Sequence, residues 1–395
     1  MAYSGHAFKF QAGGYYFREK TDVRFLIFGL FNPTPGQPGY VYGFLQNPVI
    51  SESSAFFGQG TINLSGSLRI TAGGRYTHDK KSRLGTTIVH SAASDPISFP
   101  PDSVNDAAVK YNKFTWRAGL EYDANSRTLL YATVSTGYKA GGFNDGCLAT
   151  VANCGSPRTA DTLFYRPETL TSYEAGFKTR TADGSLRLNG AIFHYDYTNL
   201  QISQIVDLGA FTSNAGTAKV DGVELEAALK PSERNTVDLG VNWLNARYTN
   251  YAIFAAVAGP PSYPEVQFAG RKLDRSPAWT ASAGYTYSMP VGDGSMAIGA
   301  RTRLSAKYYL LSAVMRAQLA QPSFTKTDLV ATYTGAGGRW YVQGYLKNIE
   351  NKLIVTSFSA SPVLGSPAGP GASFQGGQVS LGDPRTFGVR AGFKF

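Results

Sequence analysis

Apolar and polar residues alternate along most of the chain. Between Lys113 and Tyr122 every second residue is apolar or aromatic, and the residues between them are polar or small. Because successive side chains of a β-strand point to opposite faces, this segment predicts a strand with one apolar and one polar face. We therefore expect an all-β protein. The alternation predicts about fourteen strands, at residues 6–20, 53–62, 67–80, 111–122, 127–141, 169–181, 185–200, 216–230, 236–250, 276–289, 295–311, 324–335, 339–354 and 384–395.

One predicted strand, 185–200, changes the phase of its alternation. Leu186 and Leu188 are even-numbered apolar residues, whereas Phe193 and Tyr195 are odd-numbered. An extra residue in one strand shifts the phase in this way, so the pattern predicts a β-bulge near Gly190.

The predicted connections alternate between short and long. The short ones, such as 123–126 and 182–184, are rich in Gly, Asp, Asn and Ser, as tight hairpin turns require. Short periplasmic turns on one side and long extracellular loops on the other are the pattern of a transmembrane β-barrel. We therefore expect an antiparallel transmembrane barrel with both termini on the side of the turns. The long connections cover about 22–52, 81–110, 142–168, 201–215, 251–275, 312–323 and 355–383.

Composition agrees with a chain that faces lipid. The 395 residues include 44 Gly, 24 Tyr, 24 Phe and 4 Trp, and only 16% are charged, against about 25% in soluble domains. No apolar stretch approaches the roughly 20 residues of a membrane-spanning helix. Aromatic residues near the predicted strand ends would form the girdles of a barrel. The alternating aromatic end, Phe393 and Phe395, is typical of proteins inserted by the outer-membrane assembly machinery, so we expect it to be the assembly signal.

The sequence favours neither catalysis nor nucleic-acid binding. Lys and Arg exceed Asp and Glu by ten, but the basic residues are dispersed along the strands and form no recognition motif. Lipopolysaccharide, an anionic solute or a metal chelate is the expected counterpart, with no nucleic acid. No Gly-rich phosphate loop, HExxH or GxSxG motif occurs, so we expect no enzyme activity and no cofactor. The four scattered histidines predict no metal site.

Five sequence blocks resemble the TonB-dependent outer-membrane receptors. They follow one another in the order that this family shows, from about Phe8 to the C-terminus. The blocks are residues 129–144 (LLYATVSTGYKAGGFN), 165–178 (YRPETLTSYEAGFK), 214–226 (NAGTAKVDGVELE), 345–352 (YLKNIENK) and 384–395 (PRTFGVRAGFKF).

This resemblance implies a 22-stranded barrel around an N-terminal plug domain, in the outer membrane of a Gram-negative bacterium. Here the first barrel-like strand begins within ten residues of Met1, and the N-terminus resembles no signal peptide. We therefore expect residues 1–395 to be the C-terminal part of the barrel, without plug domain or first strands. Such a fragment should form an open, curved sheet or an improperly closed barrel. It would not transport alone, and TonB would act only through the missing N-terminal part.

Candidate site residues follow from strand parity and from the resemblance. Seven charged residues are expected to face the lumen, most of them in ion-pair ladders. The two cysteines, Cys147 and Cys154, share one long loop with six residues between them. In an oxidising compartment a loop-stapling disulfide is favoured, and a metal site is the alternative. Contacts to the transported ligand are not identified by the sequence. The lumen-facing residues are Glu174, Lys178, Glu224, Glu226, Arg301, Arg303 and Lys307.

Three classes of function are compatible with these patterns. The first is a receptor barrel for TonB-energised uptake of a scarce solute, a ferric siderophore before an oligosaccharide. The second is a passive outer-membrane diffusion channel of fourteen strands that closes on itself. The third is a soluble β-propeller or sandwich, which would be extracted without detergent. A signal peptide, a plug domain and further strands encoded upstream of Met1 would identify the first.

Overall fold

A computed structural model describes the fold of most of the chain. It covers residues 1–5, 7–30, 40–91, 103–148, 157–206, 209–214, 216–254, 265–311, 319–361 and 376–394. Strands dominate these residues, which confirms the all-β expectation. The described part contains no helix long and apolar enough to cross a membrane.

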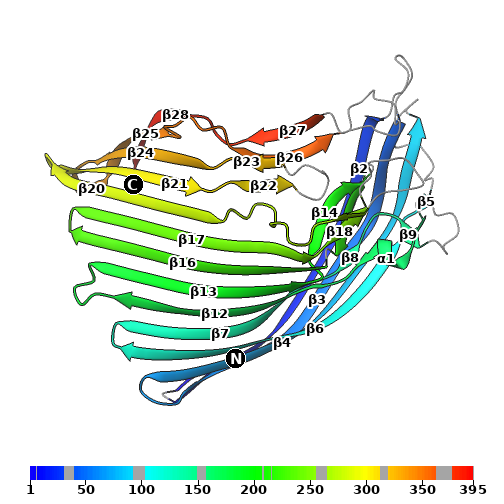
Figure 1. Ribbon diagram of the computed structural model, residues 1–395, viewed down its shortest axis with the longest axis horizontal. Helices are drawn as coiled ribbons and strands as arrows, with labels where there is room; N and C mark the ends of the chain where they lie inside the picture. Colours follow the sequence, from blue (N-terminus) through cyan, green and yellow to red (C-terminus); the bar gives the residue numbers. More distant parts are fainter. Residues whose placement is uncertain are drawn as a thin grey trace.

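One large antiparallel sheet contains sixteen strands (Figure 1). Each strand pairs with the strands beside it in the order of the sheet. Every one of the fourteen predicted ranges overlaps one of its strands, and the sheet also contains the short β1 and β5. In order, its members are β1 (Ala2–Ser4), β2 (Phe8–Leu30), β3 (Tyr40–Asn63), β4 (Leu68–Ser91), β6 (Ala107–Asn125), β7 (Thr128–Lys139), β12 (Glu168–Arg180), β13 (Leu186–Thr198), β16 (Thr217–Ser232), β17 (Asn235–Asn250), β20 (Trp279–Val291), β21 (Gly294–Ser305), β24 (Phe324–Thr334), β25 (Trp340–Lys347) and β28 (Thr386–Phe393), with β5 (Ser103–Val104) paired to β4.

The sheet is curved and open (Figure 1). Its order runs from β1 to β28, and these two end strands do not pair with each other in the described ranges. On β28 the side chains of Phe387 and Val389 are 82% and 76% exposed. The open, curved sheet expected from the sequence is therefore observed.

Tight turns and long connections lie at opposite ends of the strands. The turns close the hairpins at one end, and short strand pairs and a single helical turn gather at the other (Figure 1). The elements at the long-connection end are β8 (Gly142–Phe143), β9 (Cys147–Leu148), β10 (Pro157–Arg158), α1 (Ala160–Leu163), β11 (Phe164–Tyr165), β14 (Gln201–Val206), β15 (Gly209–Asn214), β18 (Ala252–Phe254), β19 (Glu265–Gln267), β22 (Tyr308–Leu311), β23 (Leu319–Gln321), β26 (Val355–Ser361) and β27 (Gly376–Leu381), whereas η2 (Ala336–Gly338) lies in a turn.

Some predicted strand lengths were wrong. β2, β3 and β4 have 23, 24 and 24 residues, because their backbones stay paired well beyond the stretch in which apolar and polar residues alternate. The predicted strand 339–354 ends at Lys347, because Asn348 has a φ of 52° and starts a turn. The buried Asn348 side chain holds this turn by donating to the carbonyl oxygens of Lys352 and Asp383 at 3.1 and 3.0 Å.

The β-bulge expected near Gly190 is absent. β13 pairs with β12 and with β16 in an unbroken register, so all its residues keep strict alternation. Phe193 and Tyr195 therefore lie on the same face as the polar residues of the sheet. Their rings stack with centroids 4.7 Å apart. The apolar pattern changes phase because aromatic side chains occupy positions on the polar face. No residue is inserted into the strand.

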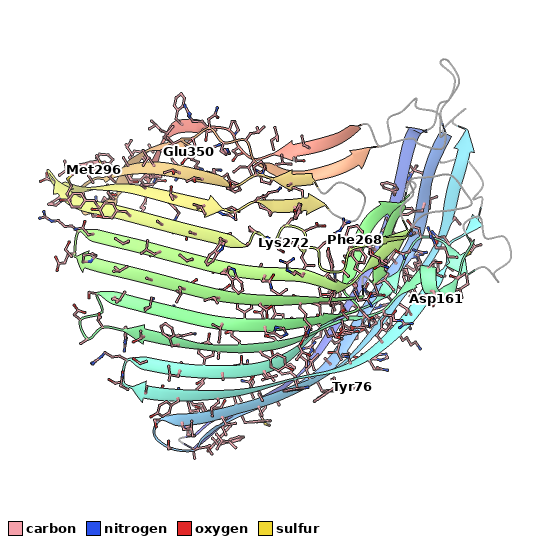
Figure 2. The ribbon with its side chains drawn as sticks, viewed as in Figure 1. Tyr76, Asp161, Phe268, Lys272, Met296 and Glu350 are labelled. Atoms are coloured by element: carbon pink, nitrogen blue, oxygen red, sulfur yellow. The ribbon has the colours of Figure 1, made fainter. Side chains whose placement is uncertain are left out.

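The pairing register divides the sheet into an apolar and a polar face. Large side chains on the apolar face are widely exposed, as expected where lipid covers a barrel. Tyr76, labelled in Figure 2, belongs to this face and is 51% exposed. Further members are Phe56, Phe114, Leu120, Tyr173, Ile192, Leu225, Leu239, Ile298, Leu304 and Leu329.

Candidate functional site

A buried arginine organises the connections at the long-loop end of the sheet. Arg83 lies near the end of β4 and is only 3% exposed. Its guanidinium donates to the carbonyl oxygens of Asn105, Asn144 and Gly146, each at 2.7 Å, and to the Asn105 side chain. Its carbon Cζ lies 4.8 Å from the centre of the Phe143 ring. One side chain of the sheet thus fixes two separate connections.

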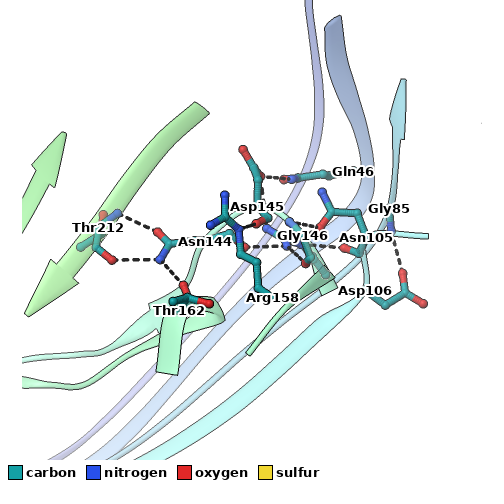
Figure 3. Close-up of polar contacts among 11 residues, drawn as sticks. Gln46, Gly85, Asn105, Asp106, Asn144, Asp145, Gly146, Arg158, Thr162 and Thr212 are labelled. Carbon is teal, nitrogen blue, oxygen red and sulfur yellow. Dashed lines mark hydrogen bonds and ion pairs between the residues drawn. The ribbon is translucent and has the colours of Figure 1, made fainter. Parts of the chain in front are cut away.

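Asp145 supplies the negative charge of this cluster. Its Oδ1 lies 3.4 Å from Nη1 of Arg83 and accepts a hydrogen bond from Gln46 at 3.1 Å, while its carbonyl oxygen accepts one from Arg158 at 2.6 Å (Figure 3). Burial lowers the pKa of Arg83 to about 10 and raises the pKa of Asp145. Arg83 therefore stays protonated at neutral pH, and the ion pair offsets the cost of burying its charge.

Asn144 joins this cluster to two further segments. Its Nδ2 donates to the carbonyl oxygens of Thr162, in α1, and Thr212, in β15, both at 2.9 Å (Figure 3). The Thr212 amide donates back to Oδ1 of Asn144 at 2.7 Å. Arg83 and Asn144 together make one hydrogen-bonded unit of β4 and three connections. We call it the Arg83 cluster.

An aromatic cluster fixes a second group of connections. Tyr248, Tyr251 and Phe268 are at most 3% exposed, and the rings of Tyr251 and Phe268 lie 5.1 Å apart. Phe268 is labelled in Figure 2. Leu200 packs against them from the connection that follows β13, and Leu273 packs from the same connection as Tyr251 and Phe268. Burial of these side chains therefore holds residues of β17 and its following connection against neighbouring loops.

The Tyr251 hydroxyl has no hydrogen-bond partner among the described residues. Burying an unpaired hydroxyl costs free energy, so Tyr251→Phe is expected to stabilise the aromatic cluster by up to about 1 kcal/mol. Slower amide hydrogen exchange at residues 265–273 would measure this gain. Phe268→Tyr, which adds a hydroxyl at a fully buried position, should accelerate exchange there. Faster exchange in Tyr251→Phe would contradict the prediction.

The sequence correctly groups six of the seven charged residues on one face. Through the register, Glu174, Glu224 and Glu226 share a face with Lys178, Arg301 and Arg303. Lys307 lies beyond the end of β21, with its Nζ 5.6 Å from the centre of the Tyr309 ring. That the shared face lines a lumen stays a prediction.

The expected ion-pair ladders do not form among the described residues. None of the seven charged residues makes an ion pair with another residue of these ranges. Lys178 and Glu226 share a row of the register, but Asn189 stands between them, which places them two strands and about 10 Å apart. Glu174 instead accepts a hydrogen bond from Tyr131 at 2.8 Å.

Cys147 lies in β9, next to the Arg83 cluster, and is 1% exposed. Cys154 lies outside the described residues, so the pairing stays a prediction.

After denaturation without reductant, iodoacetamide should leave the chain unlabelled, and prior reduction should add two labels. Two labels without reduction would exclude the disulfide.

The described residues contain no group of three or more His, Cys, Asp or Glu side chains that could hold a metal.

The proposed assembly signal is only partly described. Phe393 ends β28 on the apolar face and is 74% exposed, whereas Phe395 lies outside the described residues. Sequence reasoning missed Arg83 and Asn105, because both fall in the expected long connection 81–110, where a polar residue carries no distinguishing signal. Asn144 could have been proposed from the sequence, because it is the last residue of the block at 129–144 that resembles the receptor family.

Comparison with known proteins identifies the family. The model of the β-barrel of TonB-dependent receptors matches residues 2–349. The chain is 25% identical over 233 residues to the pesticin receptor of Yersinia pestis, which covers 57% of this chain and 32% of that protein. It is 28% identical over 128 residues to the catecholate siderophore receptor Fiu of Escherichia coli K12, covering 32% and 16%.

Solved structures share the fold. The ferric yersiniabactin uptake receptor FyuA of Yersinia pestis matches with a TM-score of 0.67 at 17% identity, over 99% of this chain and 56% of that chain. The closed form of Fiu from Escherichia coli K12 gives 0.66 at 17% identity, over 99% and 52%. The chain thus spans about a third of the length of the first curated relative and about half of these structures. The family match covers most of the sequence, and the chain belongs to the TonB-dependent receptor β-barrel family.

Proposed function

We propose that this chain is part of the barrel wall of an outer-membrane receptor that takes up a ferric siderophore with energy supplied through TonB. The open antiparallel sheet, with one exposed apolar face and one polar face, carries this proposal. The family match supports it, as do the names of relatives that bind catecholate or yersiniabactin siderophores. The cell outer membrane of a Gram-negative bacterium is the corresponding location.

In this proposal the two ends of the sheet have different tasks. The connections fixed by the Arg83 cluster and the aromatic cluster form the external mouth, where a ligand first binds. The polar face lines the route inward, and its unpaired charges keep that route hydrated. Uptake moves the ligand without breaking a bond, so no catalytic residue is needed and the chain is not an enzyme.

The remaining wall, the plug domain and the TonB-contacting segment belong to residues outside this sequence in our proposal. In the part of the chain that the structure describes, the two end strands of the sheet do not pair with each other. This supports the arrangement, because a barrel in lipid needs every strand edge paired. The same observation counts against a passive channel of fourteen strands. We assign insertion to the outer-membrane assembly machinery acting on the β28 end, with outer-membrane lipid and lipopolysaccharide against the apolar face.

Uptake of radioactive iron tests this function. Cells that lack their own siderophore receptors would express the gene with its upstream reading frame and receive ferric catecholate or ferric yersiniabactin. We expect iron to accumulate, and deletion of TonB to abolish the accumulation. Accumulation that persists without TonB would favour a passive channel. Uptake of labelled oligosaccharides and not of iron would make the ligand a sugar.

A further inference from the structure

Four charged residues form one row across β2, β3, β4 and β6, towards the long-connection end of the sheet. The pairing register places each of them directly beside the next. In β3, β4 and β6 the charged residue lies four positions from an exposed aromatic residue, so both side chains point to the apolar face of the sheet. The charged residues are Arg18, Glu52, Lys80 and Lys110, and the aromatic residues are Phe56, Tyr76 and Phe114.

The apolar face changes from aromatic to charged over a short distance at this end. Phe56, Tyr76 and Phe114 lie directly beside one another and are more than half exposed, as in an aromatic girdle at a membrane interface. His78 and Asn112 separate this girdle from the charged row, with Nδ1 and Oδ1 2.6 Å apart. Four residues of a strand span about 13 Å, which the tilt of barrel strands reduces to about 10 Å along the membrane normal. The charged row therefore lies at the level of lipid headgroups.

Positive charge is in excess in the row. Arg18 and Lys80 share the carboxylate of Glu52, with N–O distances of 3.1 and 3.8 Å. Lys110 forms no ion pair with another residue of the described ranges, and it stands directly opposite Lys80. Like charges at directly opposite positions destabilise a sheet. Three cations with one carboxylate leave two positive charges uncompensated within the row.

Neighbouring carboxylates on the same strands point away from the row. Glu19 follows Arg18 in β2 and Asp79 precedes Lys80 in β4, so alternation turns both carboxylates towards the polar face. Asp79 is only 8% exposed there. The sheet itself therefore separates these two acids from the lipid side.

Two further carboxylates lie beyond the row, on the side of the long connections. Asp22 is four residues from Arg18, about 13 Å along β2. Asp106 accepts a hydrogen bond from the Gly85 amide at 2.8 Å, and Gly85 is five residues, about 16 Å, beyond Lys80 in β4. Both distances exceed the screening length of about 8 Å at physiological ionic strength. The two positive charges of the row are therefore open to an external anion.

The position of the row selects an amphiphilic anion. A soluble anion would contact the cations and leave the aromatic girdle bare. A lipid satisfies both, because its acyl chains cover the apolar side chains while the lysine stems direct their ammonium groups to its headgroup. Arg18 and Lys110 are three strand spacings, about 14 Å, apart. This span suits a headgroup with more than one phosphate, and Lys and Arg are both good phosphate ligands.

We infer that Arg18, Lys80 and Lys110 bind the phosphate groups of a lipid A-type glycolipid in the outer leaflet, whose acyl chains cover the aromatic girdle. The site gives the lipopolysaccharide assigned to the apolar face a defined place on β2, β3, β4 and β6. It rests on the outer-membrane location in the proposed function, but neither the transported ligand nor TonB takes part in it.

Native mass spectrometry of the full chain in detergent micelles tests the site with lipid A that carries two phosphates, in the presence of EDTA to remove bridging divalent cations. We expect one lipid A to bind, and Lys80→Gln/Lys110→Gln to lower the affinity at least about tenfold. Lys80→Arg/Lys110→Arg keeps both charges and should retain the affinity. Arg234→Gln/Arg339→Gln removes two charges from turns at the opposite end of the sheet and should also retain it. The folded band in gel electrophoresis shows that each variant is folded.

Three results would overturn the inference. The first is the absence of defined binding of lipid A to the unmodified chain. The second is an equal loss of affinity in the turn variant, which would mean that overall charge attracts the lipid. The third is equal affinity for phosphatidylglycerol, or displacement of lipid A by an equal concentration of inorganic phosphate, which would make the row a general anion site.

The lipid site and the proposed function can fail separately. Iron uptake that depends on TonB, without defined binding of lipid A, would contradict only the lipid site. Binding of lipid A that is lost in Lys80→Gln/Lys110→Gln, without iron uptake, would contradict only the proposed transport of a ferric siderophore.

Discussion

Replacing Arg83 with methionine is expected to release the connections at the external mouth while leaving the membrane-spanning sheet intact. The change removes the buried cation from the partly buried Asp145, which keeps Arg158 nearby, and removes the donors to three carbonyl oxygens. Breaking one partner of a buried, hydrogen-bonded ion pair costs about 3–5 kcal/mol. We expect residues 142–148 and 157–165 to lose protection from hydrogen exchange and to become sensitive to protease.

Two control variants distinguish the loss of the Arg83 cluster's contacts from a general effect of removing a positive charge. Arg83→Lys keeps the charge but cannot reproduce the several simultaneous hydrogen bonds, so it should give an intermediate loss of protection. Arg18→Met removes an exposed cation from β2, whose ion pair with Glu52 lies at 3.1 Å, and should change protection by very little. Normal protection of residues 142–148 and 157–165 in Arg83→Met would contradict the assigned role.

Introducing arginine on the apolar face should impair membrane insertion, whereas introducing it at the adjacent position should be tolerated. Leu225 is 45% exposed on the apolar face of β16, and Glu224 points to the polar face. An arginine facing lipid near the middle of the membrane costs about 2–4 kcal/mol. Leu225→Arg should therefore lower the free energy of unfolding in lipid vesicles by this amount, and Glu224→Arg by much less.

Urea unfolding from vesicles, followed by the shift of the folded band in gel electrophoresis, measures this difference. The two variants add the same side chain one residue apart, so the strand propensity of the new residue is matched. The net charge rises by one in Leu225→Arg and by two in Glu224→Arg, so a larger loss in Leu225→Arg does not come from net charge. Equal losses would mean that the two faces of β16 do not differ in environment. A larger loss in Glu224→Arg would reverse the assignment of the lipid-facing and polar faces.

The main sheet was predictable because its physical constraint is visible in the sequence. One face meets lipid and the other meets polar surroundings, so the chemistry of β6 or β16 repeats every second residue. The extended ends of β2 and β3 were missed, since beyond the membrane neither face needs to be apolar and the backbone pairing continues unmarked. The aromatic pair Phe193 and Tyr195 misled the reading of β13, because a polar face tolerates stacked rings.

Site prediction had a different limit. Parity shows which face a charge occupies, and it placed Glu226 and Lys178 correctly on one face. It does not show which residue stands between them, and the pairing of strands put Asn189 there. The Arg83 cluster depends on contacts between β4 and connections about 60 residues away in sequence. Such contacts follow from the closure of loops and leave no local pattern.

The hydrogen bonds of Asn144 have a consequence for the thermodynamics of ligand binding. A ligand that orders a mobile loop must compensate for the lost conformational entropy, which costs about 0.5–1.5 kcal/mol for each immobilised side chain. Asn144 already ties β15 and α1 to one frame, so much of this entropy is lost during folding, before any ligand arrives. A ligand that touches these segments then meets a pre-organised surface, and more of its contact energy appears as affinity.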